Sequence, residues 1–209
     1  MKALVLLNGE PPSKELLDEQ LAGAELVVCA DGAACWAYPD IKIDVLIGDM
    51  DSIGDRLKDA ARSIRKIVTL QCEKDETDAQ AAIQVCLEAG ADEIVLLGAL
   101  GKRFDHALGN LQLLRMIEQK GVDARIEDGG MTVFALLGRK ELSGWPGRLI
   151  SLIPLGESIH VCTSGLKYPL CDEWLDPALP RGVSNEFLGE EATVVVTGGY
   201  CALTLLRRT

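Results

Sequence analysis

Short apolar runs alternate with polar, helix-forming segments through the N-terminal part of the chain, and this alternation constrains the fold most. The apolar runs have strand length and occupy residues 2–7, 26–30, 45–47, 66–70, 94–97 and 124–127. Helical patterns separate most of them, at residues 13–21, 55–62 and 77–89 and in the stripe Phe104, Leu108, Leu111, Leu114 and Ile117. Strands alternating with helices predict βαβ units, and therefore a Rossmann-like α/β domain with a largely parallel sheet.

The pattern changes towards the C-terminus. Short β-rich runs at residues 148–155, 158–163, 192–197 and 202–206 are broken by Gly and Pro, with no helical period between them. Such a pattern predicts a small antiparallel β domain, a sandwich or a partial barrel. We therefore expect an α/β domain at residues 1–137 and a smaller antiparallel β-sandwich domain at residues 138–209.

Composition narrows the possible partners and the compartment. The 209 residues are 48% hydrophobic and carry a formal net charge of −11, which supports a real core and disfavours binding to nucleic acid. No apolar run approaches membrane-spanning length, and no secretory signal pattern precedes the first strand. Cys29, Cys86, Cys162 and Cys201 stand singly in apolar stretches, which indicates reduced core cysteines in a cytoplasmic protein.

Polar clusters follow four of the expected strands. They lie at residues 8–9, 31–32, 49–51 and 98–105. In parallel sheets ligands bind beyond the carboxyl ends of the strands, so this coincidence indicates a binding site at one sheet edge. Asp49 and Asp51 stand two positions apart, and Mg²⁺ prefers such carboxylate oxygens together with water and substrate phosphate. Alone, the pair is also compatible with a polar turn.

The segment EKDETDAQ (73–80) provides a second acidic cluster. Thr77 and Gln80 have the spacing of a helix capping box, and acidic residues favour a helix N-terminus. Helix capping explains Thr77 and one acidic residue. It does not explain Lys74, which stands among three acidic residues, or why Asp75 and Asp78 form a second acidic group. These carboxylates are candidates to hold a cation and to leave one over as a general base.

The segment GALGKRFDHALGN (98–110) supplies positive charge beside a glycine turn. Backbone amides at the start of the following helix are suited to a phosphate, and Lys102 and Arg103 are suited to neutralise it. His106 is more often a capping or packing residue than a base at such a place. Asp31, before Gly32, is equally compatible with a turn and with a ligand contact.

Taken in order, ADGAA (30–34), GDMDS (48–52), KDETD (74–78) and GALGKRFDHALGN (98–110) strongly resemble thiamine pyrophosphokinases. SLIPLG (151–156), GLKYPL (165–170) and SNEF (184–187) resemble the thiamine-binding domain of that family. The resemblance covers nearly the whole chain. It implies a homodimeric enzyme with active sites between subunits. With Mg²⁺ it would transfer the terminal diphosphate of ATP to the hydroxyl of thiamine, giving thiamine diphosphate and AMP.

The resemblance also implies roles for individual residues. Metal ligands would be Asp49, Asp51 and Asp78, with Asp75 beside them, and catalytic residues would be Asp78, Arg103 and Asp105. Contacts to ATP would come from Asp31, Lys102, Arg103, His106 and Asn110, and contacts to thiamine from Ser184 and Asn185. The thiamine proton would go to Asp78 or Asp105, a choice that the sequence leaves open. Cys35 stands where the family often has Asn, so no ligand contact is assigned to it.

Two other classes of function remain compatible with parts of the pattern. A nucleotide-sugar glycosyltransferase also holds a divalent cation with a DxD after a strand, but it does not account for KDETD and RFDH. A nucleotide- or thiamine-binding regulatory module would retain the pocket without turnover. The intact set of acidic residues, together with Arg103, argues against such a loss.

Overall fold

A computed structural model describes residues 1–50, 63–71 and 75–206, and the contacts divide the chain into two units. Unit 1 comprises Met1–Leu113 and Gln119–Gly129, and unit 2 comprises Leu114–Glu118 and Gly130–Thr209. The boundary expected between residues 137 and 138 falls within strand β7 (Met131–Ser143). The helix expected at residues 55–62, the metal candidate Asp51 and Lys74 lie outside the described residues.

Unit 1 is built on a parallel sheet. Its strands are β1 (Lys2–Leu6), β2 (Leu26–Ala30), β3 (Val45–Gly48), β4 (Lys66–Thr69), β5 (Glu93–Leu97) and β6 (Asp123–Asp128). They pair in the order β6-β5-β1-β2-β3-β4, and each neighbouring pair is parallel. The chain runs outward from β1 to β4 and then crosses to β5 on the other side of β1. The strand order therefore reverses between β1 and β5, and the expected parallel α/β domain is confirmed.

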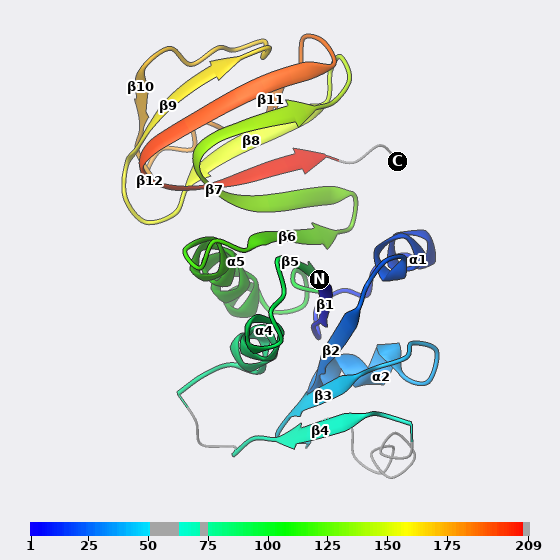
Figure 1. The fold of residues 1–209 in the computed structure, drawn as a ribbon. Coiled ribbons are helices and arrows are strands. Elements are labelled where there is room, and N and C mark those ends of the chain that lie inside the picture. Colours follow the sequence, from blue (N-terminus) through cyan, green and yellow to red (C-terminus); the bar gives the residue numbers. More distant parts are fainter. Residues whose placement is uncertain (51–62, 72–74, 207–209) are drawn as a thin grey trace. The chain divides into compact units, whose positions relative to one another are not determined.

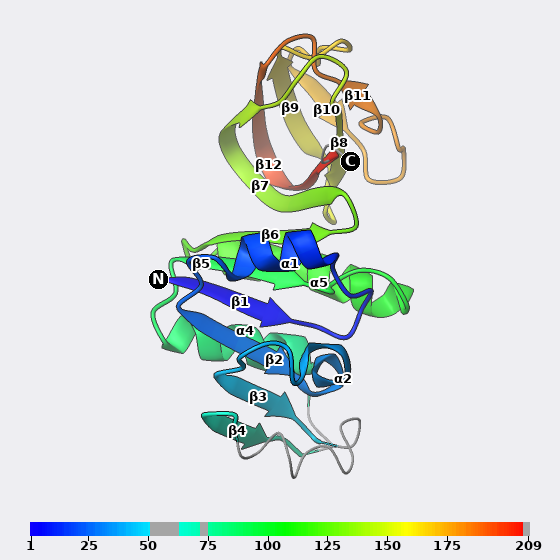
Figure 2. The same ribbon diagram turned by 90° about the vertical axis from the view of Figure 1, so that its right-hand side faces the viewer.

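Helices cover both faces of this sheet. They are α1 (Lys14–Leu21), η1 (Asp31–Ala33), α2 (Ala34–Ala37), α4 (Asp78–Glu88) and α5 (Phe104–Glu118). Figures 1 and 2 show α1 and α2 on one face and α4 and α5 on the other. Ala34 and Ala37 of α2 pack with Leu4, Leu6 and Cys29 in one buried cluster. Small side chains on α2 thus allow the helix to approach the sheet closely.

The apolar stripe predicted for α5 is only partly a core face. Leu114 and Ile117 are buried, as the helical spacing predicts. Phe104 and Leu108, in contrast, are 78% and 48% exposed. The periodicity identifies the helix correctly, but it cannot tell which turns of the stripe have a packing partner within the chain.

Unit 2 is an antiparallel β structure with its own core. Its strands are β7 (Met131–Ser143), β8 (Leu149–Pro154), β9 (Ile159–Ser164), β10 (Glu173–Leu175), β11 (Asn185–Glu186) and β12 (Glu191–Leu206). The first part of β12 pairs with β9 and its last part pairs with β8, while β7 accompanies it along both. The two sets of strands enclose Ile150, Leu152, Val161, Val194 and Leu203. The expected β-sandwich is confirmed.

The two long strands of unit 2 are bent, and this explains two differences from the sequence prediction. The register between β12 and β7 shifts between Val196 and Cys201, around the positive φ of Gly198. The runs expected at residues 192–197 and 202–206 are therefore two halves of one strand. β7 was not predicted as a strand because Gly138, also with a positive φ, interrupts its alternation.

The cysteine prediction is correct at three of four positions. Cys29, Cys86 and Cys201 are buried free thiols, whereas Cys162 is exposed. Burial raises the pKa of all three buried thiols, to about 12 for Cys86 and Cys201. The prediction is wrong for Cys162 because β9 lies at a sheet surface, where alternate side chains of an apolar run face outward.

Candidate active site

The strand order brings the polar clusters to one edge of the unit 1 sheet. The loops after β1, β2, β3 and β5 carry them, and these four strands are neighbours in the order β5-β1-β2-β3. Because parallel strands point the same way, their carboxyl ends share an edge. The point where the strand order reverses, between β5 and β1, is where an open α/β sheet forms a crevice for a ligand.

Backbone hydrogen bonds hold the loops after β1 and β5 together. Gly9 donates its N–H to the Gly98 carbonyl at 2.7 Å, and Glu10 donates to the Leu100 carbonyl at 2.9 Å. A Cβ on Gly9 would lie 2.1 Å from the Leu100 carbonyl oxygen, so only glycine fits this close approach. The buried carboxylate of Asp128 accepts the Leu100 N–H at 3.2 Å, and burial raises the pKa of Asp128.

The loop after β5 leads directly into α5. Gly98, Gly101 and Lys102 all have positive φ, which gives the tight turn predicted from the glycines. Asn110, buried on α5, donates its side-chain amide to the Ala99 carbonyl at 2.7 Å and so ties the helix to the loop. The start of α5 is therefore held at a fixed place beside this loop, and the first N–H groups of a helix favour an anion.

Arg103 and Asp105 form a two-pronged ion pair at this helix start. Arg103 donates Nε to Asp105 Oδ1 at 3.1 Å and Nη2 to Oδ2 at 2.5 Å. These hydrogen bonds lower the pKa of Asp105 to about 2 and raise the pKa of Arg103. Lys102, one residue earlier, donates Nζ to Asn8 Oδ1 at 3.3 Å.

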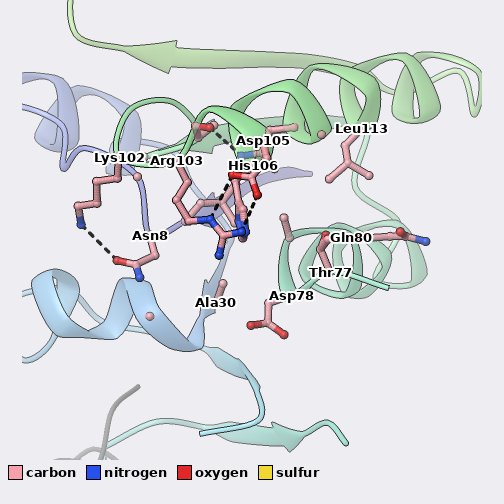
Figure 3. A pocket seen from close by; sticks show the side chains of 18 of the residues that line it. Asn8, Ala30, Thr77, Asp78, Gln80, Lys102, Arg103, Asp105, His106 and Leu113 are labelled. Atoms are coloured by element: carbon pink, nitrogen blue, oxygen red, sulfur yellow. Dashed lines mark hydrogen bonds and ion pairs between the residues drawn. The ribbon is translucent and has the colours of Figure 1, made fainter. Parts of the chain in front are cut away.

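The start of α4 forms the opposite wall. Thr77 caps the helix by accepting the Gln80 N–H at 3.2 Å, as the capping-box spacing predicts. Asp78 is the first residue of α4, and it lines the pocket together with Thr77 and Gln80. Asp75 is exposed in the preceding bend. Figure 3 shows Thr77 and Asp78 of α4 across the pocket from Arg103, Asp105 and His106.

The pocket between these walls has a volume of about 790 Å³. Its lining includes six of the predicted site residues, namely Asp78, Lys102, Arg103, Asp105, His106 and Asn110. This size accommodates a nucleotide-sized ligand. The lining places two cations and a helix N-terminus on one side and the Asp78 carboxylate on the other.

Other predicted residues lie outside this lining. Asp31 is buried, and a Cβ on Gly48 would lie 2.4 Å from its Cβ, so Asp31 packs against the end of β3. Asp49 follows β3 and is half-buried. Cys35 is exposed on α2, and it too is absent from the lining.

The two thiamine candidates belong to unit 2. Asn185 is buried, accepts the Tyr168 N–H at 3.0 Å and donates to the Tyr168 carbonyl at 2.7 Å. Its side chain thus fixes the turn at Tyr168 beside a hollow of about 170 Å³ that Tyr168, Arg181 and Asn185 help to line. Ser184 is exposed with φ 61°, and its N–H donates to Ser151 Oγ at 3.0 Å.

Several residues of the unit 1 pocket were not assigned from the sequence. Asn8, Thr77, Gln80 and Gln112 line it alongside the predicted residues. Asn8 had a detectable signal, since Asn8–Gly9 follows the first strand at the same sheet edge. The α4 and α5 residues had none beyond helical phase, because a polar residue on an exposed helix face is usually solvated.

Two family models match the chain. "Thiamin pyrophosphokinase, catalytic domain" matches residues 17–126, and "Thiamin pyrophosphokinase, vitamin B1 binding domain" matches residues 139–201. The first match alone spans more than half of the chain, and the two fall on the α/β and the β part respectively.

Curated relatives and solved structures agree with these matches. A thiamine pyrophosphokinase of Bacillus subtilis is 33% identical over 170 residues, which cover 78% of this chain and 77% of the relative. Thiamine pyrophosphokinase 2 of Arabidopsis thaliana is 32% identical, covering 80% and 72%. The crystal structure of the Bacillus subtilis enzyme superposes with a TM-score of 0.86, 25% identity and full coverage of both chains. The Candida albicans structure shares the fold, with a TM-score of 0.84 at 19% identity and 99% and 90% coverage.

The order of the motifs, the pocket at the reversal of the strand order and these similarities lead to one assignment. The chain belongs to the thiamin pyrophosphokinase family.

Proposed function

We propose that this protein transfers the diphosphate group of ATP to the hydroxyl of thiamine, giving thiamine diphosphate and AMP. One observation carries the proposal: the pocket at the reversal of the strand order combines the start of α5, Lys102 and Arg103 with the Asp78 carboxylate on the opposite wall. Phosphoryl chemistry depends mainly on positioning and charge neutralisation, and these groups serve both needs.

The phosphates of ATP bind at the loop between β5 and α5. The N–H groups at the start of α5 would face the phosphates, and Lys102 and Arg103, which line the pocket, add positive charge within a chain of net charge −11. His106 and Asn110 extend this wall along α5, and Asp31, which follows β2, packs against the end of β3. Arg103 stabilises the charge that develops as the bond to AMP breaks.

Mg²⁺ is the proposed cation, and the donor set fits it. Asp49, Asp51 and Asp78 offer the carboxylate oxygens that Mg²⁺ prefers. Among the described residues no group of three or more His, Cys, Asp or Glu side chains forms a metal cage. Mg²⁺ does not need one, because water and substrate phosphates complete its coordination. Bound there, the cation would neutralise phosphate charge, and the acidic residues named here would hold it.

Asp78 is the better of the two candidates for the thiamine proton. Asp105 is held in two hydrogen bonds by Arg103, and its pKa of about 2 makes it a weak proton acceptor near neutral pH. We therefore assign Asp105 to the positioning of Arg103. Asp49 and Asp51 then remain as the proposed ligands of the cation, together with Asp78.

Thiamine binding is proposed for the β domain, residues 138–209, through Ser184 and Asn185. The match of residues 139–201 to the vitamin B1 binding domain supports this assignment. A cytoplasmic location is proposed because the buried cysteines Cys29, Cys86 and Cys201 are thiols and not parts of disulfides. No helix in the described ranges is long and apolar enough to cross a membrane. A homodimer is proposed as the working form.

One assay tests the reaction. The protein is incubated with ATP, Mg²⁺ and thiamine, and the products are separated by chromatography. AMP and thiamine diphosphate in equal amounts are expected. ADP with thiamine monophosphate would contradict diphosphate transfer. Binding of both ligands without any product would indicate a regulatory module, and turnover of a nucleotide sugar would indicate the glycosyltransferase.

A further inference from the structure

Two exposed cysteines lie in unit 2, and the proposed function uses neither. Cys162 is on β9, and Cys171 precedes β10. Buried thiols with a raised pKa, such as Cys86 and Cys201, are poor reactants. Accessible thiols are the ones open to exchange and oxidation. Two of them form an intramolecular disulfide only if the fold brings them together.

The contacts on either side of Cys162 place it opposite two residues, Cys171 and Asp172. Val161 pairs with Glu173, and the Thr163 N–H bonds to the Leu170 carbonyl at 2.8 Å. Between these two pairs, β9 contributes only Cys162, while the facing strand contributes Cys171 and Asp172. This is a β-bulge, and the positive φ of 60° at Asp172 is consistent with it.

A direct contact fixes the sulfur of Cys162 at this bulge. The Asp172 N–H donates to Cys162 Sγ at 3.2 Å. The Cα of Cys171 is only about 2.4 Å from that nitrogen by standard bond lengths. Cys162 Sγ therefore lies within about 6 Å of the Cys171 Cα. Directly opposed antiparallel residues have Cα separations of about 4.5 to 5.5 Å, inside the range of about 4.4 to 6.8 Å that disulfides adopt.

The Asp172 side chain of the bulge lies on the same sheet surface as Cys162. His160 and Cys162 are two residues apart on β9 and therefore share a face. His160 Nε2 is 3.0 Å from Asp172 Oδ1, so Asp172 reaches that face as well. The ring centroids of Trp174 and His160 are 5.0 Å apart, and Trp174 is exposed. Because Cys162 and Cys171 are both exposed, a small oxidant can reach the two thiols.

We propose that Cys162 and Cys171 are a redox modification site that closes reversibly into an intramolecular disulfide. The oxidant is a low-molecular-weight disulfide such as oxidised glutathione. The thiolate of one cysteine attacks it and releases one glutathione thiol, and the second cysteine then attacks the mixed disulfide and releases another. Two electrons pass to the oxidant, the protein loses two hydrogens, and each released thiol takes up one.

The disulfide would staple the turn that joins β9 to β10. This turn contains Tyr168 and Leu170, which line the smaller hollow of unit 2. Formation of this disulfide is independent of the proposed function, because it is measured as a change in the mass and peptides of the protein and not as turnover.

Peptide mapping tests the proposal directly. The purified full chain is equilibrated in glutathione redox buffers, free thiols are blocked with an alkylating agent, and the protein is digested with trypsin without reduction. Cleavage after Arg148, Lys167 and Arg181 puts the two cysteines on separate peptides, 149–167 and 168–181. We expect these peptides to be linked in the oxidised sample, and the intact chain to lose about 2 Da. Dithiothreitol should reverse both the peptide link and the loss of mass.

Serine variants provide the controls. Cys162→Ser and Cys171→Ser should each lose the link and retain glutathione on the remaining cysteine, a gain of about 305 Da. Cys35→Ser removes an exposed thiol in unit 1 and should leave the link intact. Stable glutathione adducts in the wild type, a link to any other cysteine, or a link between two chains would overturn the proposal. Circular dichroism of each reduced variant shows that folding is unchanged.

Discussion

At the residue scale, the pair Arg103–Asp105 sets the charge balance at the pocket. Both side chains are largely exposed, so solvent screens the pair and its contribution to the free energy of unfolding is small. Its effect on protonation is nevertheless clear. The pKa of Asp105 falls from 3.8 to about 2 in the folded chain. The stability it contributes is therefore present above about pH 3.8 and is lost as the pH falls toward 2.

We predict that Arg103→Ala returns the pKa of Asp105 to near its ordinary value, because the two hydrogen bonds to the carboxylate disappear. An NMR titration that follows the Asp105 side-chain carboxyl measures this. Lys102→Ala is the matched control, since Lys102 bonds to Asn8 instead; in that variant the pKa should stay at about 2. An unchanged Asp105 pKa in Arg103→Ala would show that another group holds the carboxylate.

Kinetic measurements should distinguish the roles of Asp78 and Asp105. We predict that Asp78→Asn lowers kcat by roughly 100-fold or more, the range expected for loss of a general base. Asp105→Asn should lower kcat less than Asp78→Asn does and should also raise KM for ATP, because Arg103 loses its orienting partner but remains present. Both are measured at saturating Mg²⁺, with thiamine diphosphate as the readout. If Asp105→Asn shows the larger loss in kcat at saturating ATP, the assignment of Asp78 fails.

Which residues line the pocket was partly predictable from the sequence. Lys102, Arg103 and Asp105 were found because charged residues that follow a glycine turn at the end of a parallel strand are typical of a ligand site. The sequence did not predict that the side-chain amide of Asn185 forms hydrogen bonds with the backbone of Tyr168. Hydrogen-bond partners distant in sequence are set by packing, which residue type and spacing do not reveal.

At the scale of elements, the two capped helices of unit 1 offer a matched comparison. Ser13 caps α1 by accepting the Leu16 N–H at 3.3 Å, much as Thr77 caps α4. Losing either hydroxyl should cost about 1 kcal/mol of stability. Of these two caps, Thr77 lines the pocket and Ser13 does not.

We therefore predict that Thr77→Ala lowers the melting temperature and also raises KM for ATP, whereas Ser13→Ala lowers only the melting temperature. Thermal unfolding and steady-state kinetics measure the two effects. Thr77→Ser, which retains the hydroxyl, should restore both. An equal change of KM in Ser13→Ala would mean that KM reports general destabilisation and not the pocket wall.

Gly109, on α5, provides a second test of the pocket wall. It lies within the helix and lines the pocket, and an added Cβ would meet nothing within 4 Å. Glycine costs a helix interior about 1 kcal/mol relative to alanine. We predict that Gly109→Ala stabilises the protein to thermal unfolding by about this amount while raising KM for ATP several-fold. Greater stability with unchanged KM would show that the nucleotide does not approach this part of α5.

At the scale of the whole molecule, the sequence predicted the two architectures because each has its own periodicity. It also predicted the shared sheet edge, since the carboxyl ends of parallel strands coincide. It did not predict the strand order, which depends on pairings between distant segments, nor the continuity of β12 through the bend at Gly198. Local patterns specify elements, whereas bends and neighbours depend on tertiary packing.

The exposed start of α5 bears on the proposed homodimer. Phe104 and Leu108 are 78% and 48% exposed and lie one helical turn apart on the same face. Leaving a phenylalanine and a leucine in water is unfavourable, because burial of each contributes roughly 1.5–3 kcal/mol. A second copy of the chain that covered this face would recover that energy, and it would do so next to the pocket residues Arg103 and Asp105.

We predict a dimer in sedimentation velocity at micromolar concentration, and a shift toward monomer in the double variant Phe104→Ser/Leu108→Ser. The matched control is Leu179→Ser/Leu188→Ser, which removes two leucines that are each 63% exposed in unit 2 and should leave the dimer intact. Sedimentation is the right readout, since activity would also respond to disturbance of the neighbouring Arg103. A wild-type monomer would refute the dimer, and equal dissociation of both double variants would refute the role of α5.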